Sequence, residues 1–135
     1  MKKRLFVLLC FLLVISLPII GSCQSLDVQP NQDILNKDIL IKAEIAHVLN
    51  SKEEVMFKPS IIVHNGSKAE ISTNGIVLTL LPQINNDNIL ITVHSTLELD
   101  NIPSELNGII LCQDRKTSSL ANSDIAISLT PSIIN

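Results

Sequence analysis

The stretch that decides the fold is Ile89-Leu90-Ile91-Thr92-Val93-His94-Ser95-Thr96-Leu97-Glu98-Leu99. Ile89, Ile91, Val93, Leu97 and Leu99 share one face, and Thr92, His94, Thr96 and Glu98 share the other. A period of two is typical of a β-strand with one buried and one exposed face. The same alternation recurs in residues 39–46 and 124–130. The sequence therefore predicts half-buried strands.

Turn signals separate these strands from other aliphatic runs. Asn-Gly pairs begin at Asn65, Asn74 and Asn107, and Asn85-Asn86-Asp87-Asn88 forms a fourth break. Asn-Gly favours tight hairpin turns because both residues tolerate positive φ. The runs between the breaks are residues 39–48, 60–64, 69–73, 76–84, 89–99, 109–113 and 124–134. We expect a mostly β fold, a small antiparallel sheet or sandwich-like domain of about six to seven short strands.

Three prolines lie in similar local sequences. They are found in Lys58-Pro59-Ser60-Ile61-Ile62, Leu81-Pro82-Gln83-Ile84-Asn85 and Thr130-Pro131-Ser132-Ile133-Ile134. Proline has no backbone N–H to donate to a ladder, so it belongs at a strand start, a bulge or a sheet edge. We expect all three prolines at edge or bulge positions.

The N-terminal residues have the pattern of an export signal. Three cations, Lys2, Lys3 and Arg4, precede an apolar run that extends to Ile20, and small residues follow it. This order is typical of a secretory signal peptide, and the run is short for a membrane span. We expect a signal peptide in residues 1–22, a polar tether in residues 23–37 and a β domain in residues 38–135.

Cys23 is the candidate site of lipid attachment. Ile20-Gly21-Ser22-Cys23 resembles a bacterial lipobox, in which the cysteine is acylated and becomes the new N-terminus. The expected location is then the periplasm or the outer membrane, with a lipid anchor. The alternative is ordinary cleavage nearby, which would leave Cys23 able to form a disulfide with Cys112. Cys112 follows the apolar run Ile109-Ile110-Leu111, which predicts a buried thiol.

The composition of the exported part excludes several classes of partner. Removal of residues 1–22 leaves seven basic and 13 acidic residues, a formal charge of −6. An acidic chain is a poor partner for nucleic acid or for an anionic lipid surface. Phe57 is its single aromatic residue, so it has no platform for stacking bases or sugars. With no nucleophile elbow and no phosphate-binding loop, we expect a non-enzymatic protein without a cofactor.

The three histidines, His47, His64 and His94, are the basis of an alternative hypothesis. Three imidazoles bind zinc when the fold brings them together. They lie 17 and 30 residues apart in the sequence, without a local pair at metal-ligand spacing. The sequence therefore favours exposed histidines, and a metal-dependent enzyme remains the alternative that requires them to converge.

Four segments resemble the C-terminal core domain of bacterial secretins, the outer-membrane channel family of type II and type III secretion and of type IV pili. In chain order they are residues 39–45, 57–71, 77–93 and 125–134. Residues 57–71 contain a proline before a β run, then Asn65-Gly66, then Ala69 and an aliphatic residue, as in that family. The loop after Ile71 is short where secretins carry long hairpins. The resemblance therefore implies a secretin-type β module rather than a pore.

These features lead to one main functional hypothesis. We expect an envelope lipoprotein that binds a protein partner and is accessory to a secretion or pilus assembly. A structural envelope lipoprotein without a specific partner is the alternative of a different class.

Overall fold

The computed structural model describes residues 32–134. The expected signal peptide and Cys23 lie outside these residues. Within the described part of the chain, no helix has the length and apolar character needed to cross a membrane.

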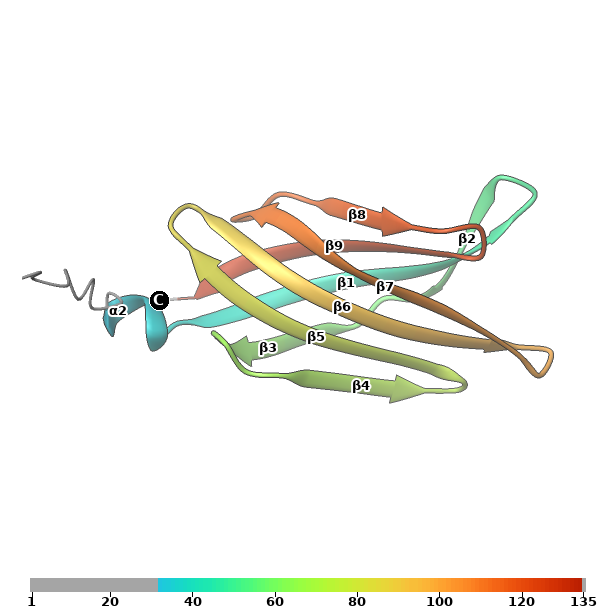
Figure 1. The fold of residues 1–135 in the computed structure, drawn as a ribbon, viewed down its shortest axis with the longest axis horizontal. Helices are drawn as coiled ribbons and strands as arrows, with labels where there is room; N and C mark the ends of the chain where they lie inside the picture. Colours follow the sequence, from blue (N-terminus) through green and yellow to red (C-terminus); the bar gives the residue numbers. More distant parts are fainter. Residues whose placement is uncertain (1–31, 135) are drawn as a thin grey trace, which may run out of the picture.

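The described residues form two antiparallel β-sheets that face each other (Figure 1). The first sheet has the order β2-β1-β9-β8, with β3 pairing the same edge of β1 as β2, and the second has the order β4-β5-β6-β7. The expected mostly β, sandwich-like fold is confirmed, but the described residues form nine strands, and β1, β6 and β7 have 12 residues each, rather than six to seven short strands. The elements are α2 (Gln32–Leu35), β1 (Asp38–Leu49), β2 (Lys52–Phe57), β3 (Ser60–His64), β4 (Ala69–Thr73), β5 (Ile76–Asn85), β6 (Asn88–Leu99), β7 (Ile102–Gln113), β8 (Ser118–Ala121) and β9 (Ile125–Ile134).

The core lies between the two sheets and consists almost entirely of aliphatic side chains. Each long strand points alternate residues inward, as the sequence pattern predicted. The largest fully buried side chains are Ile39, Ile41, Ile45, Leu78, Leu80, Ile89, Ile91, Val93, Leu97, Ile125, Ile127 and Leu129. Their close packing supplies the hydrophobic stabilisation of a domain that has few aromatic residues.

The Asn-Gly pairs have three different roles. Asn74-Gly75 is the predicted hairpin turn between β4 and β5, and both residues have positive φ, 38° and 78°. Asn65-Gly66 instead connects β3 of the first sheet to β4 of the second. Asn107-Gly108 lies within β7, where it pairs with β6, so the expected turn there is wrong. A Cβ at Gly108 would lie 2.6 Å from Cδ2 of Leu120, so a larger residue there would require the Leu120 side chain to shift.

Each of the three prolines lies where one neighbouring strand has no ladder partner for it, as an edge position requires, although Pro82 and Pro131 belong to the inner strands β5 and β9. Pro59 occupies the gap between β2 and β3, and Pro82 and Pro131 lie beyond the ends of the short neighbouring strands β4 and β8. Each proline carbonyl accepts a backbone hydrogen bond from outside the regular ladder. The donors are Ala43 N at 2.9 Å from Pro59 O, Gly66 N at 2.8 Å from Pro82 O and Arg115 N at 2.7 Å from Pro131 O.

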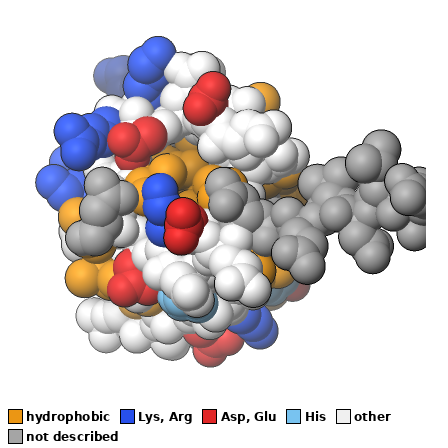
Figure 2. Space-filling model, turned by 90° about the vertical axis from the view of Figure 1, so that its left-hand side faces the viewer, with side chains coloured by type: hydrophobic (Ala, Val, Ile, Leu, Met, Phe, Trp, Pro, Cys, Tyr) orange, Lys and Arg blue, Asp and Glu red, His pale blue; other side chains and the backbone are white. Residues whose placement is uncertain are grey.

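The two ends of the sandwich differ. One end carries α2, the start of β1 and the end of β9, and Figure 2 shows apolar side chains among charged ones at this end. Asn65 fixes the segment before β1, since its Nδ2 donates to Ile34 O at 2.9 Å and its N–H donates to Lys37 O at 2.9 Å. Residues 32–37 of the expected tether therefore contact the domain. The β1–β2 hairpin and the β6–β7 turn lie at the opposite end (Figure 1).

Candidate binding surfaces

A shallow hollow lies on the outer face of the first sheet. Its volume is about 320 Å³, and its lining residues are Lys42, Ala43, Glu44, Lys58, Pro59, Ser60, Thr117, Ser128 and Thr130. Strand β1 and strand β9 supply the floor, because their outward positions are polar while their inward positions build the core. The break in the edge strand at Pro59 supplies one wall. Pro59 and its neighbours Lys58 and Ser60 line this side of the hollow.

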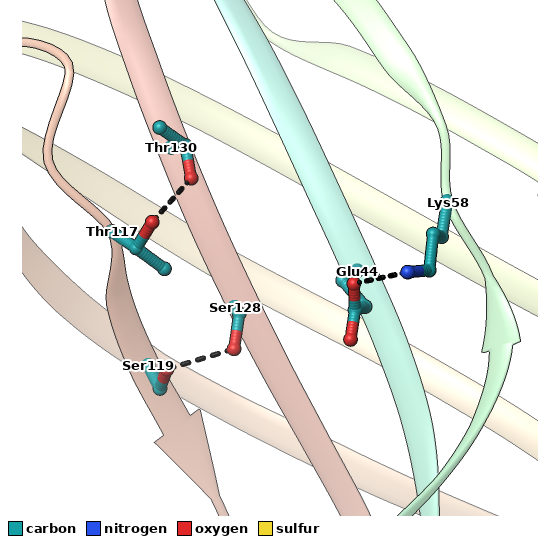
Figure 3. Close-up of polar contacts among 6 residues, drawn as sticks. All are labelled: Glu44, Lys58, Thr117, Ser119, Ser128 and Thr130. Carbon is teal, nitrogen blue, oxygen red and sulfur yellow. Dashed lines mark hydrogen bonds and ion pairs between the residues drawn. The ribbon is translucent and has the colours of Figure 1, made fainter.

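Polar side chains in and beside this hollow are paired with one another (Figure 3). Nζ of Lys58 lies 2.8 Å from Oε2 of Glu44, and the two side chains are 65% and 43% exposed. The Oγ1 atoms of Thr117 and Thr130 are 2.7 Å apart, and the Oγ atoms of Ser119 and Ser128 are 2.8 Å apart. An exposed ion pair contributes about 0–1 kcal/mol to the free energy of folding, so the Lys58–Glu44 pair adds little to the stability of the fold. The hollow presents hydroxyls and two opposite charges without enclosing a ligand.

Four large apolar side chains are exposed at the end of the sandwich opposite α2. We call Leu49, Val55, Met56 and Ile102 the distal surface; their exposed fractions are 49%, 41%, 42% and 68%. Leu49, Val55 and Met56 belong to the β1–β2 hairpin, which extends past the rest of the first sheet (Figure 1). Ile102 begins β7 and lies beside a hollow of about 260 Å³ that His47, Asp100 and Asp124 also line. Val55 and Met56 are consecutive in β2, so their side chains lie on opposite faces of the hairpin. Exposed apolar side chains in such numbers at one end of a domain are typical of protein–protein contact.

Two further apolar residues are exposed on the edge strand of the second sheet. Ile109 and Leu111 of β7 are 67% and 59% exposed and lie opposite Thr92 and Leu90 of β6. They occupy the outer face of that sheet rather than either end of the molecule. This position makes them a matched comparison for the distal surface.

The three histidines do not form a site. His64 lies opposite Asp38 at the start of β1, and its Nδ1 is 3.0 Å from Asp38 Oδ1. His47 is nine residues further along β1, which at ~3.3 Å per residue places it about 30 Å away. His94 is on the outer face of the second sheet, where its Nδ1 contacts Oδ1 of Asn107. No group of three metal-ligating side chains occurs within residues 32–134. The hypothesis of a shared zinc site at these histidines is therefore wrong.

Cys112 is fully buried in the core on β7, opposite Ile89 of β6. Burial raises the pKa of its thiol above the ordinary value of 9.0, and a hydrogen bond with Ser118 opposes this effect. Within the described residues the thiol is free of a disulfide. The expectation of a buried thiol is confirmed, while the disulfide with Cys23 stays a prediction because Cys23 lies outside the described residues.

Sequence reasoning missed the hairpin that carries most of the distal surface. Residues 52–57 read as a charged loop, Lys52-Glu53-Glu54, followed by three apolar residues. The run Val55-Met56-Phe57 directly before Lys58-Pro59 was the available signal, because a β-branched and apolar run that ends at an edge proline is typical of an edge strand.

Comparisons with protein-family models, with curated proteins and with solved structures found no match to this chain.

Proposed function

We propose that this protein is an exported envelope lipoprotein whose secretin-like β module binds a protein component of a secretion or pilus assembly. The observation that carries the proposal is the distal surface, formed by Leu49, Val55, Met56 and Ile102. A protein that binds through this surface buries side chains that water now contacts.

The position of the distal surface supports a protein partner over a lipid partner. The chain reaches the sandwich at α2, and a lipid anchor at Cys23 would hold that end toward the membrane. Strand β1 runs from this end to the hairpin, and its 12 residues span ~40 Å at about 3.3 Å per residue. The distal surface would therefore point away from the membrane that anchors the protein.

The character of the outer faces supports a binding role over catalysis. The hollow on the first sheet is shallow, and its ion pair is exposed to water. Enzymes act in sites that exclude water and hold reacting groups in an enclosed geometry. Paired hydroxyls and scattered charges on an open face are instead typical of the polar rim of a protein interface.

Site-specific crosslinking in cells tests this proposal. A photoreactive amino acid at Met56 is expected to form a crosslink to a secretion or pilus component, identified by mass spectrometry. The same amino acid at Ile109 is the matched control, since Ile109 is exposed to a greater degree but lies on the outer face of the second sheet. We expect the crosslink to be weak or absent from that position.

Two results would contradict the proposal. One is that the probe at Met56 crosslinks to lipid or to abundant envelope proteins, and that the probe at Ile109 gives the same set of crosslinked products. The other is a deletion strain in which secretion and pilus assembly are intact while the envelope is weakened, which would favour a structural lipoprotein.

A further inference from the structure

The sequence contains three Asn-Gly pairs, and the fold places them in three different environments. Asparagine is thermally labile, and the lability is greatest before glycine because no side chain hinders attack by the next backbone nitrogen. We propose that the β4–β5 turn is a modification site, where Asn74 deamidates spontaneously with water as the co-reactant while the fold protects Asn65 and Asn107.

The reaction at Asn74 requires no enzyme and no oxidant. The backbone nitrogen of Gly75 loses its proton to the solvent and attacks Cγ of Asn74. The bond from Cγ to the side-chain nitrogen then breaks, and the departing NH2 group takes a proton from water and leaves as ammonia. A five-membered succinimide results. Water then adds to one of the two ring carbonyls and breaks its bond to the ring nitrogen. The products are aspartate, or isoaspartate in which the backbone runs through Cγ.

The geometry of the β4–β5 turn leaves both reacting groups accessible. Asn74 and Gly75 are exposed residues between two strands, outside the paired ladder. Within residues 32–134, the side chain of Asn74 makes no hydrogen bond, and the N–H of Gly75 donates to no backbone carbonyl. The Gly75 carbonyl, in contrast, accepts a bond of 2.8 Å from Glu98 N. Within the described residues, neither the nucleophile nor the leaving amide is held by a hydrogen bond.

Asn65 is held at both of the groups that would have to react. Its Nδ2, the leaving group, donates to Ile34 O at 2.9 Å, and its Oδ1 accepts from Ile84 N at 2.8 Å. The N–H of Gly66, the nucleophile, donates to Pro82 O at 2.8 Å. Cyclisation at Asn65 requires these three hydrogen bonds to break together.

Asn107 is protected by its strand. It pairs with His94 in the middle of the β6–β7 ladder, and its Oδ1 contacts the His94 ring. Extended backbone keeps the next nitrogen away from Cγ, and Leu120 packs over Gly108. Cyclisation here requires local opening of the ladder.

Isoaspartate at position 74 would alter the hairpin. It adds one carbon to the backbone of a two-residue turn and introduces a negative charge next to Glu98, whose Cβ lies 3.4 Å from the ideal Cβ position of Gly75. The bond from Glu98 N to Gly75 O depends on the present turn, so the modification loosens the contact between this turn and β6.

Peptide mapping of the processed protein after prolonged incubation at mildly alkaline pH tests the proposal. The amide-to-acid mass change, and labelling by an isoaspartate methyltransferase, are expected at Asn74 at least about tenfold faster than at Asn65 or Asn107. Asn74→Gln should remove most of the early label. In urea, where the fold is lost, all three pairs should react at similar rates.

Two outcomes would overturn the proposal. Conversion of Asn65 or Asn107 as fast as Asn74 in the folded protein would show that the fold does not select the site. The absence of conversion at Asn74 in the folded protein, while the urea-treated protein reacts, would show that the turn itself protects the residue.

Discussion

At the scale of the single residue, Ser95 is the one departure from the aliphatic face of β6. It lies between Val93 and Leu97 and is fully buried, and within the described residues its Oγ has no hydrogen-bond partner. A buried hydroxyl without a partner costs about 1–3 kcal/mol in lost hydration. Ser95 is therefore a site where the native sequence is not optimal for stability.

Replacement of Ser95 by alanine is expected to raise the free energy of unfolding by about 1 kcal/mol, because the unpaired hydroxyl is removed and little volume is lost. Urea denaturation of the processed protein measures the change. Ser119→Ala, on the exposed outer face of β8, is the control and should change stability by less than about 0.5 kcal/mol. A loss of stability in Ser95→Ala would mean that the hydroxyl binds a buried water molecule or another partner.

At the scale of the element, Asn65 joins three segments that are distant in the sequence. Its side chain bonds Ile34 O in α2 and Ile84 N near the end of β5, while its own backbone connects β3 to β4. The half-buried N–H of Ile84 would lose its acceptor without this side chain. Asn65 thus positions the segment through which the expected anchor reaches the sandwich.

Asn65→Ala is expected to lower the free energy of unfolding by about 1–3 kcal/mol, since it leaves a donor and an acceptor unpaired. The same variant should increase amide hydrogen exchange at Ile84 and in residues 34–37 before global unfolding. Asn107→Ala, whose side chain contacts only the exposed His94 ring, is the matched control. Equal effects of the two substitutions would contradict the role of Asn65.

The strands with clear alternation could be predicted from the sequence, and the others could not. The inward residues of β1, β6 and β9 follow the pattern directly, because burial of one sheet face selects aliphatic residues at alternate positions. Strand β8 has only four residues, too few for a period to show. Asn107-Gly108 was misassigned because turn propensity is local, whereas the pairing of this stretch with His94 and Val93 of β6 is set by the tertiary fold.

At the scale of the whole molecule, the sequence indicates which side of a strand is buried but not which strand lies next to it. Strands β1 and β9, at the two ends of the described chain, pair along ten residues from Asp38↔Ile134 to His47↔Ile125. Alternation contains no information about such a distant partner. The distal surface could not be predicted for the same reason, since the exposure of Met56 follows from the position of β2 at the edge of the first sheet.

The proposed anchor gives the whole molecule its orientation, and Cys23 tests it. Acyl chains contribute ~0.8 kcal/mol per buried CH₂, so two or three of them hold a small acidic domain at a bilayer. Cys23→Ser should therefore move the protein from the membrane pellet to the soluble periplasmic fraction and abolish labelling by a radioactive fatty acid.

Cys112→Ala is the control that separates lipidation from a disulfide. Cys112 is buried and its thiol has a raised pKa, so it is a poor thiolate nucleophile, and its replacement should leave both the membrane location and the fatty-acid label unchanged. Lipidation would be contradicted if the wild-type protein took up no fatty-acid label and its gel mobility shifted on reduction, while neither cysteine variant showed that shift. That result would establish the Cys23–Cys112 disulfide instead. Because Cys112 faces the core, the sandwich would have to open near β7 for this bond to form.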